Sequence, residues 1–474
     1  MEIIIYIYQY VVFVYSISIT TNYITLAILG FVAIRRKKTN YTDKEQELFA
    51  DSPEAAPGIS IVAPAYNEEV IVIDNVTSLL SLDYPKFEVV IVNDGSEDRT
   101  LELLIERFDL EEVSIDYTYK VKCRPVKRIF KSVNPLYDKL IVVDKLNGGT
   151  KADAMNAGVN IIQYDYFINT DVDCLLARDT LKKIIMPVLD SNVRVIAVGA
   201  TMRMVNGCEV EDGIITRVRP PSRIVPLFQE TEYLRSYLVA KMGWSSLNAI
   251  PNVSGGFGLF DSNVVINTGG FDPLSHAEDM DMTIRIRAYM YDKGEKHKIE
   301  QIPDSCCWTE GPPNLKILWR QRTRWGRGLM QIFIVHRKFL FNRKYGRMGL
   351  LILPYSLLFE FLAPIIEFTG VLFLIHLIYN SEINFATFLL LLFFVYLIGV
   401  TSSMITITYD FLVKRQYNTL KEYFKLMMFS AVEAFLYHPF VVIFSLYGYI
   451  QFFVRKEFKW GAMTRQGFSK KQST

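Results

Sequence analysis

Two carboxylates stand one residue apart at a point where the chain could hold a metal ion. Asp171 and Asp173 follow the short apolar run at 166–168. Oxygen ligands at this spacing suit a divalent cation such as Mg²⁺ or Mn²⁺, which could also bridge phosphates. A solvated turn or a helix cap would use the same two residues, so the pair by itself is a weak signal. Its position directly after an apolar run favours the metal site.

A second acidic pair, Glu278-Asp279, could supply a general base. Such a base must reach the proton that it removes and must have a suitable pKa. The alternative is an acidic first turn of the helix that continues through Arg285 and Arg287, because helices often begin with acidic residues. Taken alone, the pair favours the helix start.

A glycine pair and a lysine offer a place for phosphate. Gly148-Gly149 gives flexible backbone, and Lys151 adds one cation where a helix is expected to begin. Helix starts of this kind favour phosphate. A loop with a surface lysine is the competing interpretation.

Arg324-Trp325 combines a guanidinium, which pairs well with phosphate, and an indole face on which a sugar can stack. The alternative is a basic amphipathic helix at a membrane interface, and both interpretations can hold together. The basic residues of this stretch are Lys316, Arg320, Arg322, Arg324 and Arg327.

These groups follow apolar runs that alternate with helical stretches. The runs are 59–64, 87–92, 140–143 and 166–168. This rhythm predicts an α/β domain with a parallel sheet covered on both faces. Ligands bind such sheets at the carboxyl ends of the strands. The segments that follow the first two runs contain Tyr66, Glu68 and Asp94.

The two ends of the chain carry the membrane signals. Residues 3–34 contain no Lys, Arg, Asp or Glu, and a span needs ~20 apolar residues. The basic cluster 35–38 follows this run, which favours a retained anchor over a signal peptide and puts residue 35 onward in the cytoplasm. Further candidate spans lie at 349–378, 386–409 and 427–454, the last with a kink expected at His438-Pro439.

We therefore predict six segments. They are an N-terminal transmembrane helix (1–34), a linker (35–58), an α/β domain (59–313), an interfacial amphipathic helix (314–345), C-terminal transmembrane helices (346–455) and a basic tail (456–474). Three C-terminal crossings would leave the tail outside, whereas its basic residues favour the inside. A re-entrant segment or an interfacial helix would resolve this conflict.

The composition excludes some partners. The 52 basic and 50 acidic residues leave a net charge of +2, so no global field attracts nucleic acid. The five cysteines have no C-x-x-C spacing, which argues against a zinc cluster or a disulfide framework. Adjacent Cys306 and Cys307 are most simply small apolar fillers.

In this order, the motifs resemble those of the membrane-bound processive family 2 glycosyltransferases, namely poly-N-acetylglucosamine, chitin, hyaluronan and cellulose synthases. The resemblance covers about residues 59 to 330, and its most diagnostic element is Q-x-x-R-W, here Gln321, Arg324 and Trp325. It implies a GT-A fold (Rossmann-like, mostly parallel sheet) and an inverting hexosyltransferase with a UDP-sugar donor, best guessed as N-acetylglucosamine. The alternative is a non-processive enzyme that adds one sugar to a membrane lipid.

The resemblance also implies a role for each matched residue. Asp279 would be the catalytic base, with Glu278 beside it. Mg²⁺ or Mn²⁺ would bind Asp171 and Asp173, with Asp173 in the more direct contact. The donor would meet Tyr66, Glu68, Asp94, Lys151, Asp171 and Arg324. The acceptor would meet Gly256, Phe257, Gln321 and Trp325.

Some features depart from the family pattern. The usual G-G-K-A reads Gly-Thr-Lys-Ala at 149–152, the acceptor stretch at 254–257 is Ser-Gly-Gly-Phe, and the basic segment 110–138 is an unassigned insertion. The implied partners are a glycan or lipid acceptor, the lipid bilayer and accessory export subunits. The expected location is a bacterial inner membrane, with the catalytic domain in the cytoplasm. A non-catalytic scaffold conflicts with the intact motif residues, and a transporter conflicts with the lack of an internal repeat.

Overall fold

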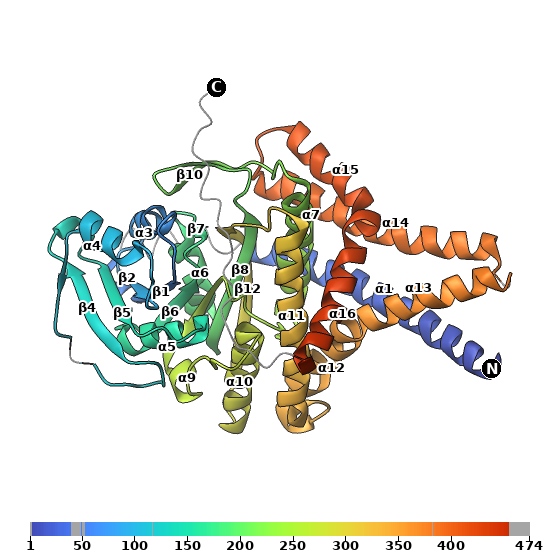
Figure 1. Cartoon of the computed structure of the whole chain (residues 1–474), viewed down its shortest axis with the longest axis horizontal. Coiled ribbons are helices and arrows are strands. Elements are labelled where there is room, and N and C mark those ends of the chain that lie inside the picture. The colour runs from blue at the N-terminus through green and yellow to red at the C-terminus, as the bar shows by residue number, and fades with distance from the viewer. Residues whose placement is uncertain (1, 39–48, 50–52, 116, 382, 455–474) are drawn as a thin grey trace.

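The protein combines an α/β domain with a set of long helices that leave it on one side (Figure 1). The computed structural model describes residues 2–38, 49, 53–115, 117–381 and 383–454. Most of the predicted linker after residue 38 and the whole predicted tail 456–474 lie outside these residues. The helices α1, α13 and α14 extend away from the sheet in the same direction (Figure 1).

The strands begin where the apolar runs predicted them. The four predicted runs form β1 (Ile59–Ala65), β2 (Phe87–Asn93), β5 (Leu140–Lys145) and β6 (Tyr166–Thr170). The other strands of the sheet are β3 (Leu110–Glu112), β4 (Val126–Ser132), β7 (Cys174–Leu176), β8 (Arg194–Met204), β11 (Phe257–Asp261) and β12 (His297–Thr309). A separate hairpin pairs β9 (Glu209–Glu211) with β10 (Ile214–Arg217). Every residue of β1, β2 and β5 is buried, because helices cover both faces of these strands.

The sheet is mostly parallel, as predicted, with three reversed strands. Among the described residues its order is β3-β4-β5-β2-β1-β6-β11-β8-β12-β7. Only β4, β11 and β7 run against the common direction. The reversed strand β11 enters between β6 and β8, with Phe257 opposite Thr170. The loop before β11 therefore ends beside the carboxyl end of β6.

The insertion at 110–138 extends one edge of the sheet. It supplies β3 and β4 and the short 3₁₀ turn η3 (Pro135–Tyr137). Its central loop is fastened to the domain, because the Asn160 side-chain oxygen accepts hydrogen bonds from the backbone N–H groups of Lys120 and Val121 at 2.8 and 2.9 Å.

Helices pack on both faces of the sheet. Alternate side chains of β2 enter different cores: Val89 and Ile91 face one, while Val90 and Val92 face the other, as the two-residue period of a strand requires. The first core is closed by α3 (Val72–Leu80), α4 (Thr100–Phe108) and α6 (Thr180–Asp190). The second is closed by α5 (Lys151–Ile161), α9 (Ser262–Asn267) and α10 (Glu278–Asp292).

The N-terminal helix crosses the domain at two glycines. It is α1 (Glu2–Lys38), which continues past the predicted end at residue 34. It packs on the π-helical η4 (Leu234–Ala240) and on α8 (Lys241–Ser246), which continue the helix α7 (Ile224–Tyr233). A Cβ on Gly30 would overlap the Val239 carbonyl, and one on Gly243 would overlap the Leu26 carbonyl. Small residues are what such a close helix crossing requires.

The helix with the Q-x-x-R-W element is shorter than predicted. It is α11 (Leu315–Val335), and Asn314 caps it by accepting a hydrogen bond from Ile317 N at 3.1 Å. The prediction that it continues to residue 345 is wrong. After Val335 the chain turns through the short 3₁₀ segments η5 (Arg337–Phe339) and η6 (Arg343–Tyr345), and between them Phe341 has a φ of 56°, which ends helical geometry.

The C-terminal region consists of helices that overlap the predicted spans, although the last helical pair begins at Leu420 and not at residue 427. They are the run of η7 (Met348–Ile352), α12 (Leu353–Tyr355), η8 (Ser356–Phe361) and α13 (Ala363–Tyr379), then α14 (Phe385–Tyr409) with η9 (Asp410–Lys414), α15 (Leu420–Leu436) and α16 (His438–Val454). Within the described residues, two helical stretches are long and apolar enough to cross a membrane, at 6–36 and 348–379. The pair α15–α16 would add a third if it counts as one span, and it bends by 49° at the predicted break. A crossing by α14 stays a prediction.

Candidate active site

The turns after β1 and β2 hold each other through side-chain hydrogen bonds. Asn67 has a φ of 56°. Its side-chain oxygen accepts a hydrogen bond from Glu97 N at 2.8 Å, and its own N–H donates to Ser96 Oγ at 3.0 Å. Asn tolerates this left-handed conformation better than most residues. The bonds fix the segment that carries Tyr66 and Glu68, two of the predicted donor residues.

Asp94 is fully buried at the carboxyl end of β2. Its Oδ1 accepts hydrogen bonds from Lys145 Nζ and from Gly148 N, the latter at 3.0 Å. Its Oδ2 is buried and has no hydrogen-bond partner among the described residues. Burial raises the pKa of Asp94, while Lys145 and the Gly148 N–H act in the opposite direction. A buried acceptor without a partner is an expected position for a ligand N–H.

Lys145 is a central residue that the sequence analysis missed. It closes β5, is fully buried, and its ammonium lies between the carboxylates of Asp94 and Asp153, with the Asp153 contact at 2.6 Å. It also donates to the Leu146 carbonyl oxygen at 2.7 Å. The available signal was the charged pair Asp144-Lys145 at the end of an otherwise apolar strand.

Lys151 is the first residue of α5 and points toward the end of β6. Thr150 caps the helix by accepting a hydrogen bond from Asp153 N at 3.4 Å. The Lys151 ammonium forms an ion pair with Asp171 and donates to the Gly255 carbonyl oxygen at 2.6 Å. Burial lowers the pKa of Lys151, but the neighbouring carboxylates outweigh this effect, so its pKa is raised overall. The lysine therefore remains a cation inside the site.

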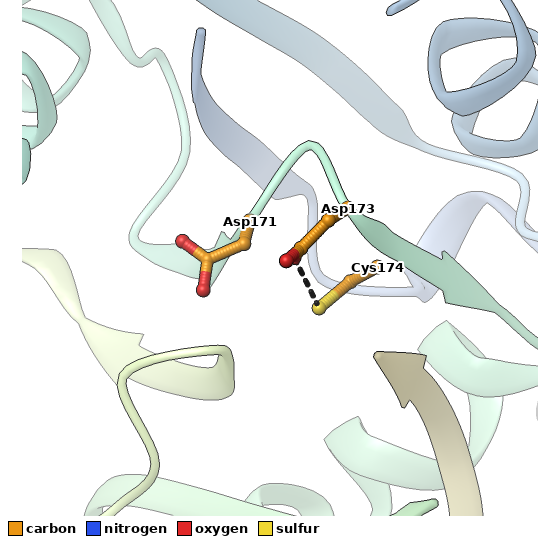
Figure 2. Close-up of side chains that lie close together, drawn as sticks. All are labelled: Asp171, Asp173 and Cys174. Atoms are coloured by element: carbon orange, nitrogen blue, oxygen red, sulfur yellow. Dashed lines mark hydrogen bonds between the residues drawn. The ribbon is translucent and has the colours of Figure 1, made fainter. Parts of the chain in front are cut away.

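Asp171 and Asp173 lie together in the turn between β6 and β7, as Figure 2 shows. One ligand atom from each of them and the Cys174 sulfur lie within 4.8 Å of one another. The hydrogen bond to Cys307 and burial raise the pKa of Cys174 well above its usual range. The thiol therefore stays protonated, and the two carboxylates are the usable ligands. Such an oxygen donor set fits Mg²⁺ or Mn²⁺.

The predicted base is held by the loop before β11. Asp279 Oδ2 accepts hydrogen bonds from Asn252 Nδ2 at 3.0 Å and from Gly255 N at 3.2 Å, and Oδ1 accepts one from Met280 N at 2.8 Å. Asp279 lies in the first turn of α10, so the helix-start interpretation of the acidic pair is confirmed, and its role as a base stays a prediction. The loop contacts hold the carboxylate in one orientation.

Glu278 lies within the electrostatic reach of both predicted diphosphate cations. Burial raises its pKa, Arg324 and Lys151 lower it, and Asp279 raises it, with a net raised pKa. Arg324 itself is exposed on α11. The structure thus brings Arg324, the predicted base and the predicted metal pair to the same edge of the sheet.

One of the four predicted acceptor residues has no exposed side chain. Phe257 is fully buried in the core beneath the sheet, because the alternation of β11 turns its side chain inward. A direct contact of this side chain with an acceptor is therefore not possible in this structure. Gln321 is half-buried and accepts a hydrogen bond from Gln229 at 3.0 Å, which joins α11 to α7, and its contact with an acceptor stays a prediction. Gly256 lies beside Asp171, and Trp325 is 38% exposed on α11.

Two polar residues that the motifs did not indicate hold the loop before β11. Asn169 donates to the Gly255 carbonyl oxygen at 2.9 Å, and Tyr237 donates to Ser254 Oγ at 3.2 Å. Neither residue belongs to a recognisable motif. Tyr237 lies in the π-helical segment η4, whose contact with the loop depends on packing between distant segments.

The comparison with protein families identifies the family to which the chain belongs. Residues 57–328 match the glycosyltransferase-like family 2, which is more than half of the chain, and the chain belongs to this family.

Two relatives of this chain are enzymes that synthesise the same polysaccharide, according to their names. Over 304 residues the chain is 27% identical to a poly-β-1,6-N-acetyl-D-glucosamine synthase of Staphylococcus aureus strain COL, covering 63% of this chain and 60% of the relative. The enzyme of the same name from Staphylococcus epidermidis is 28% identical over 308 residues, covering 65% and 62%. Each match spans less than two thirds of the relative's length.

A solved structure supports the fold. A mannosyltransferase from Pyrobaculum calidifontis, in complex with GDP-Man and Mn²⁺, matches with a TM-score of 0.50 at 16% identity, covering 92% of this chain and 98% of that one. Identity this low shows the fold alone. The prediction of a GT-A domain combined with apolar helices is confirmed.

Proposed function

We propose that this chain is an inverting glycosyltransferase that moves N-acetylglucosamine from UDP-N-acetylglucosamine onto a growing polysaccharide at the cytoplasmic membrane face. One arrangement carries the proposal. The Gly255 carbonyl accepts a hydrogen bond from Lys151, and its N–H donates to Asp279. A cation suited to a diphosphate and a carboxylate suited to a general base are thereby attached to one residue. The similarity to poly-N-acetylglucosamine synthases supports a polymer over a single-sugar lipid product.

The donor base would bind at the ends of β1 and β2. A uracil ring carries one imide N–H, and Asp94 Oδ2 is the buried acceptor without a partner among the described side chains. A hydrogen bond to an ionised carboxylate is stronger than one between neutral groups. Tyr66 and Glu68 lie in the adjoining turn and would contact the nucleoside from the same side.

The chemistry is a single displacement. The acceptor hydroxyl attacks the anomeric carbon, its proton passes to Asp279, and the bond from that carbon to the diphosphate oxygen breaks. One displacement inverts the anomeric configuration without a covalent intermediate. Because Asn252 and the Gly255 N–H hold Asp279 in one orientation, the base is preorganised for this transfer.

Negative charge develops on the leaving diphosphate. Lys151 and Arg324 would supply cations that stabilise this charge, and burial strengthens the effect of Lys151, whose side chain is only 10% exposed. A divalent cation held by Asp171 and Asp173 would neutralise further charge when bound. The mannosyltransferase of similar fold, solved with Mn²⁺, supports a metal of this type.

The apolar helices would anchor the enzyme in a bilayer. The basic residues 35–38 follow the candidate span at 6–36, and positive charge of this kind marks the cytoplasmic side. The catalytic domain would then face the cytoplasm, where nucleotide sugars are available. We place the enzyme in a bacterial inner membrane, with accessory export subunits as candidate partners.

Product analysis tests the proposal. The full chain, purified in nanodiscs, is incubated with Mg²⁺ or Mn²⁺ and with labelled UDP-N-acetylglucosamine, UDP-glucose or UDP-glucuronate in separate reactions. We expect a polymer from UDP-N-acetylglucosamine alone. A single-sugar lipid would favour the glycolipid alternative, and a polymer from another donor would overturn the assigned sugar. The absence of transfer and of UDP release in every reaction would contradict the proposed activity.

A further inference from the structure

The indole of Trp325 rests on a buried guanidinium. The Arg322 guanidinium carbon lies 4.4 Å from the centre of the Trp325 ring. Arg322 is only 4% exposed, whereas Trp325 is 38% exposed. The ring therefore has one face supported by the protein and remains partly open to solvent. A cation over an aromatic face is attractive, most of all when it is desolvated.

Two further residues fix the plane of that guanidinium. Both Arg322 terminal nitrogens donate to the two carboxylate oxygens of Glu232, at 2.8 and 2.5 Å. One of them also donates to the Tyr437 hydroxyl at 2.9 Å, and this hydroxyl donates to Glu232 at 3.0 Å. A bidentate arginine–carboxylate pair sets orientation as well as energy. Burial raises the pKa of Glu232, but Arg322 outweighs it and the net pKa is lowered.

These three residues come from separate elements. Glu232 lies in α7, Arg322 in α11, and Tyr437 at the break between α15 and α16, where the helices bend by 49°. The Tyr437 hydroxyl, at this bend, contacts both partners. Gln321, the neighbour of Arg322, also bonds to α7 through Gln229. The turn of α11 that carries Arg322 is thus held to α7 and to the break between α15 and α16.

We propose that Arg322, Glu232 and Tyr437 are positioning residues that hold the Trp325 indole as a platform for the acceptor sugar. The inference rests on the proposed glycosyl transfer and adds residues that the Q-x-x-R-W pattern does not assign. A sugar presents C–H groups to an aromatic face, so its binding depends on the angle of the ring. The donor base would bind at the ends of β1 and β2, and of α11 only Arg324 would meet the diphosphate, so donor binding should depend on the cluster less than acceptor binding does.

The main variant is Arg322→Lys, which keeps a cation near Glu232 but removes the planar group under the indole. In nanodiscs, with the full chain, we would measure KM for an added β-1,6-linked N-acetylglucosamine oligomer and KM for UDP-N-acetylglucosamine. We expect the acceptor KM to rise ~10-fold, as loss of a desolvated cation–aromatic contact implies. The donor KM should stay within about 2-fold, because most of the proposed donor residues lie on other elements and the variant leaves Arg324 itself in place.

Tyr437→Phe gives a milder variant that removes one hydroxyl and should raise the acceptor KM ~3-fold. Its matched control is Tyr447→Phe. Tyr447 lies in α16, and its ring lies 5.5 Å from that of Trp319, another tryptophan of α11. Its hydroxyl accepts a hydrogen bond from Gln451 at 2.6 Å, within the same helix. Both KM values should be unchanged in this control.

Fluorescence supplies a readout that needs no turnover. The emission of Trp325 is obtained as the difference between the protein and its Trp325→Phe variant, each with or without Arg322→Lys. We expect Arg322→Lys to shift this difference spectrum and lower its anisotropy.

An unchanged spectrum would overturn the inference. So would an equal rise of donor and acceptor KM, which indicates general distortion. If the wild type transfers no sugar, the proposed function fails, and the spectrum alone decides whether Arg322 orders the indole.

Discussion

Lys151 and Asp171 form an ion pair at the carboxyl edge of the sheet, one from the start of α5 and the other from the turn after β6. The same ammonium donates to the Gly255 carbonyl. One lysine therefore connects three parts of the predicted site: the start of α5 after Gly148-Gly149, the predicted metal pair, and the loop that orients Asp279. Its removal should affect donor binding before it affects the fold, because its partners remain near solvent.

Lys151→Met should raise KM for UDP-N-acetylglucosamine ~10- to 100-fold, because a hydrogen bond to a charged group contributes about 1.5–3 kcal/mol. Steady-state kinetics and equilibrium binding of UDP both report this change. The control is Lys183→Met on α6, which removes an ion pair with Asp179 at 2.5 Å. Unchanged UDP binding in Lys151→Met would remove the lysine from the donor site.

Asp279→Asn should keep UDP binding and lose transfer by about 10²- to 10⁴-fold, the usual contribution of a general base. The amide keeps the size of the side chain and can still contact the loop. Radiolabelled transfer and calorimetric UDP titration separate the two effects. Asp292→Asn, at the other end of α10, serves as the control. Near-normal turnover in Asp279→Asn would sink the assignment of the base.

Chelation with EDTA should abolish transfer, and Mn²⁺ or Mg²⁺ should restore it. Asp173→Ala should raise the Mn²⁺ concentration needed for half-maximal activity at least ~10-fold, because one carboxylate ligand is lost. Paramagnetic resonance of Mn²⁺ in the presence of UDP reports binding without turnover. Asp165→Ala, just before the opposite end of β6, is the control. Full activity after chelation would rule out the metal.

Lys145→Met should destabilise the domain by about 3–5 kcal/mol near neutral pH, because it leaves two buried carboxylates without their cation. Burial raises the pKa of Asp94 above its ordinary value of 3.8, and Lys145 opposes that rise. In the Lys145→Met variant, the pKa of Asp94 in the folded state should rise further.

A carboxyl group with a raised folded-state pKa contributes stability below its unfolded pKa and loses it as pH rises through the folded pKa. The loss of unfolding free energy in Lys145→Met, relative to the wild type, should therefore grow between about pH 4 and pH 7. Thermal unfolding of variant and wild type across this range measures it. A deficit independent of pH would show that lost packing, and not the charge, causes the effect.

Much of the catalytic edge could be predicted from local sequence signals. The apolar runs of β1, β2, β5 and β6, with polar residues directly after them, predicted a sheet whose carboxyl edge carries Asp94, Lys151 and the Asp171–Asp173 pair. These signals are local because burial on two faces makes a strand continuously apolar, and its end is marked by the first turn residues. The break at His438-Pro439 was also predicted from a local signal, because proline interrupts the helix that precedes it but is tolerated in the first turn of the next helix, where Pro439 lies.

Other features depend on which segments become neighbours. Phe257 was expected to face the acceptor, but the antiparallel insertion of β11 turns it into the core. The role of Lys145 depends on β5 lying beside β2, so that its ammonium reaches Asp94. Side-chain direction alternates along a strand, so a one-residue change in register reverses it. No local pattern specifies that register.

The sequence by itself determined the kinds of residue at the strand ends, their order along the chain and the apolar helices around the domain. The tertiary structure alone decided the partners: Gly255 between Lys151 and Asp279, and Arg322 under Trp325. Lys151 and Gly255 are 104 positions apart, and Arg322 and Tyr437 are 115 apart. Contacts at such separation follow from strand order, helix crossing and the bend at Tyr437, which arise only when the whole chain packs.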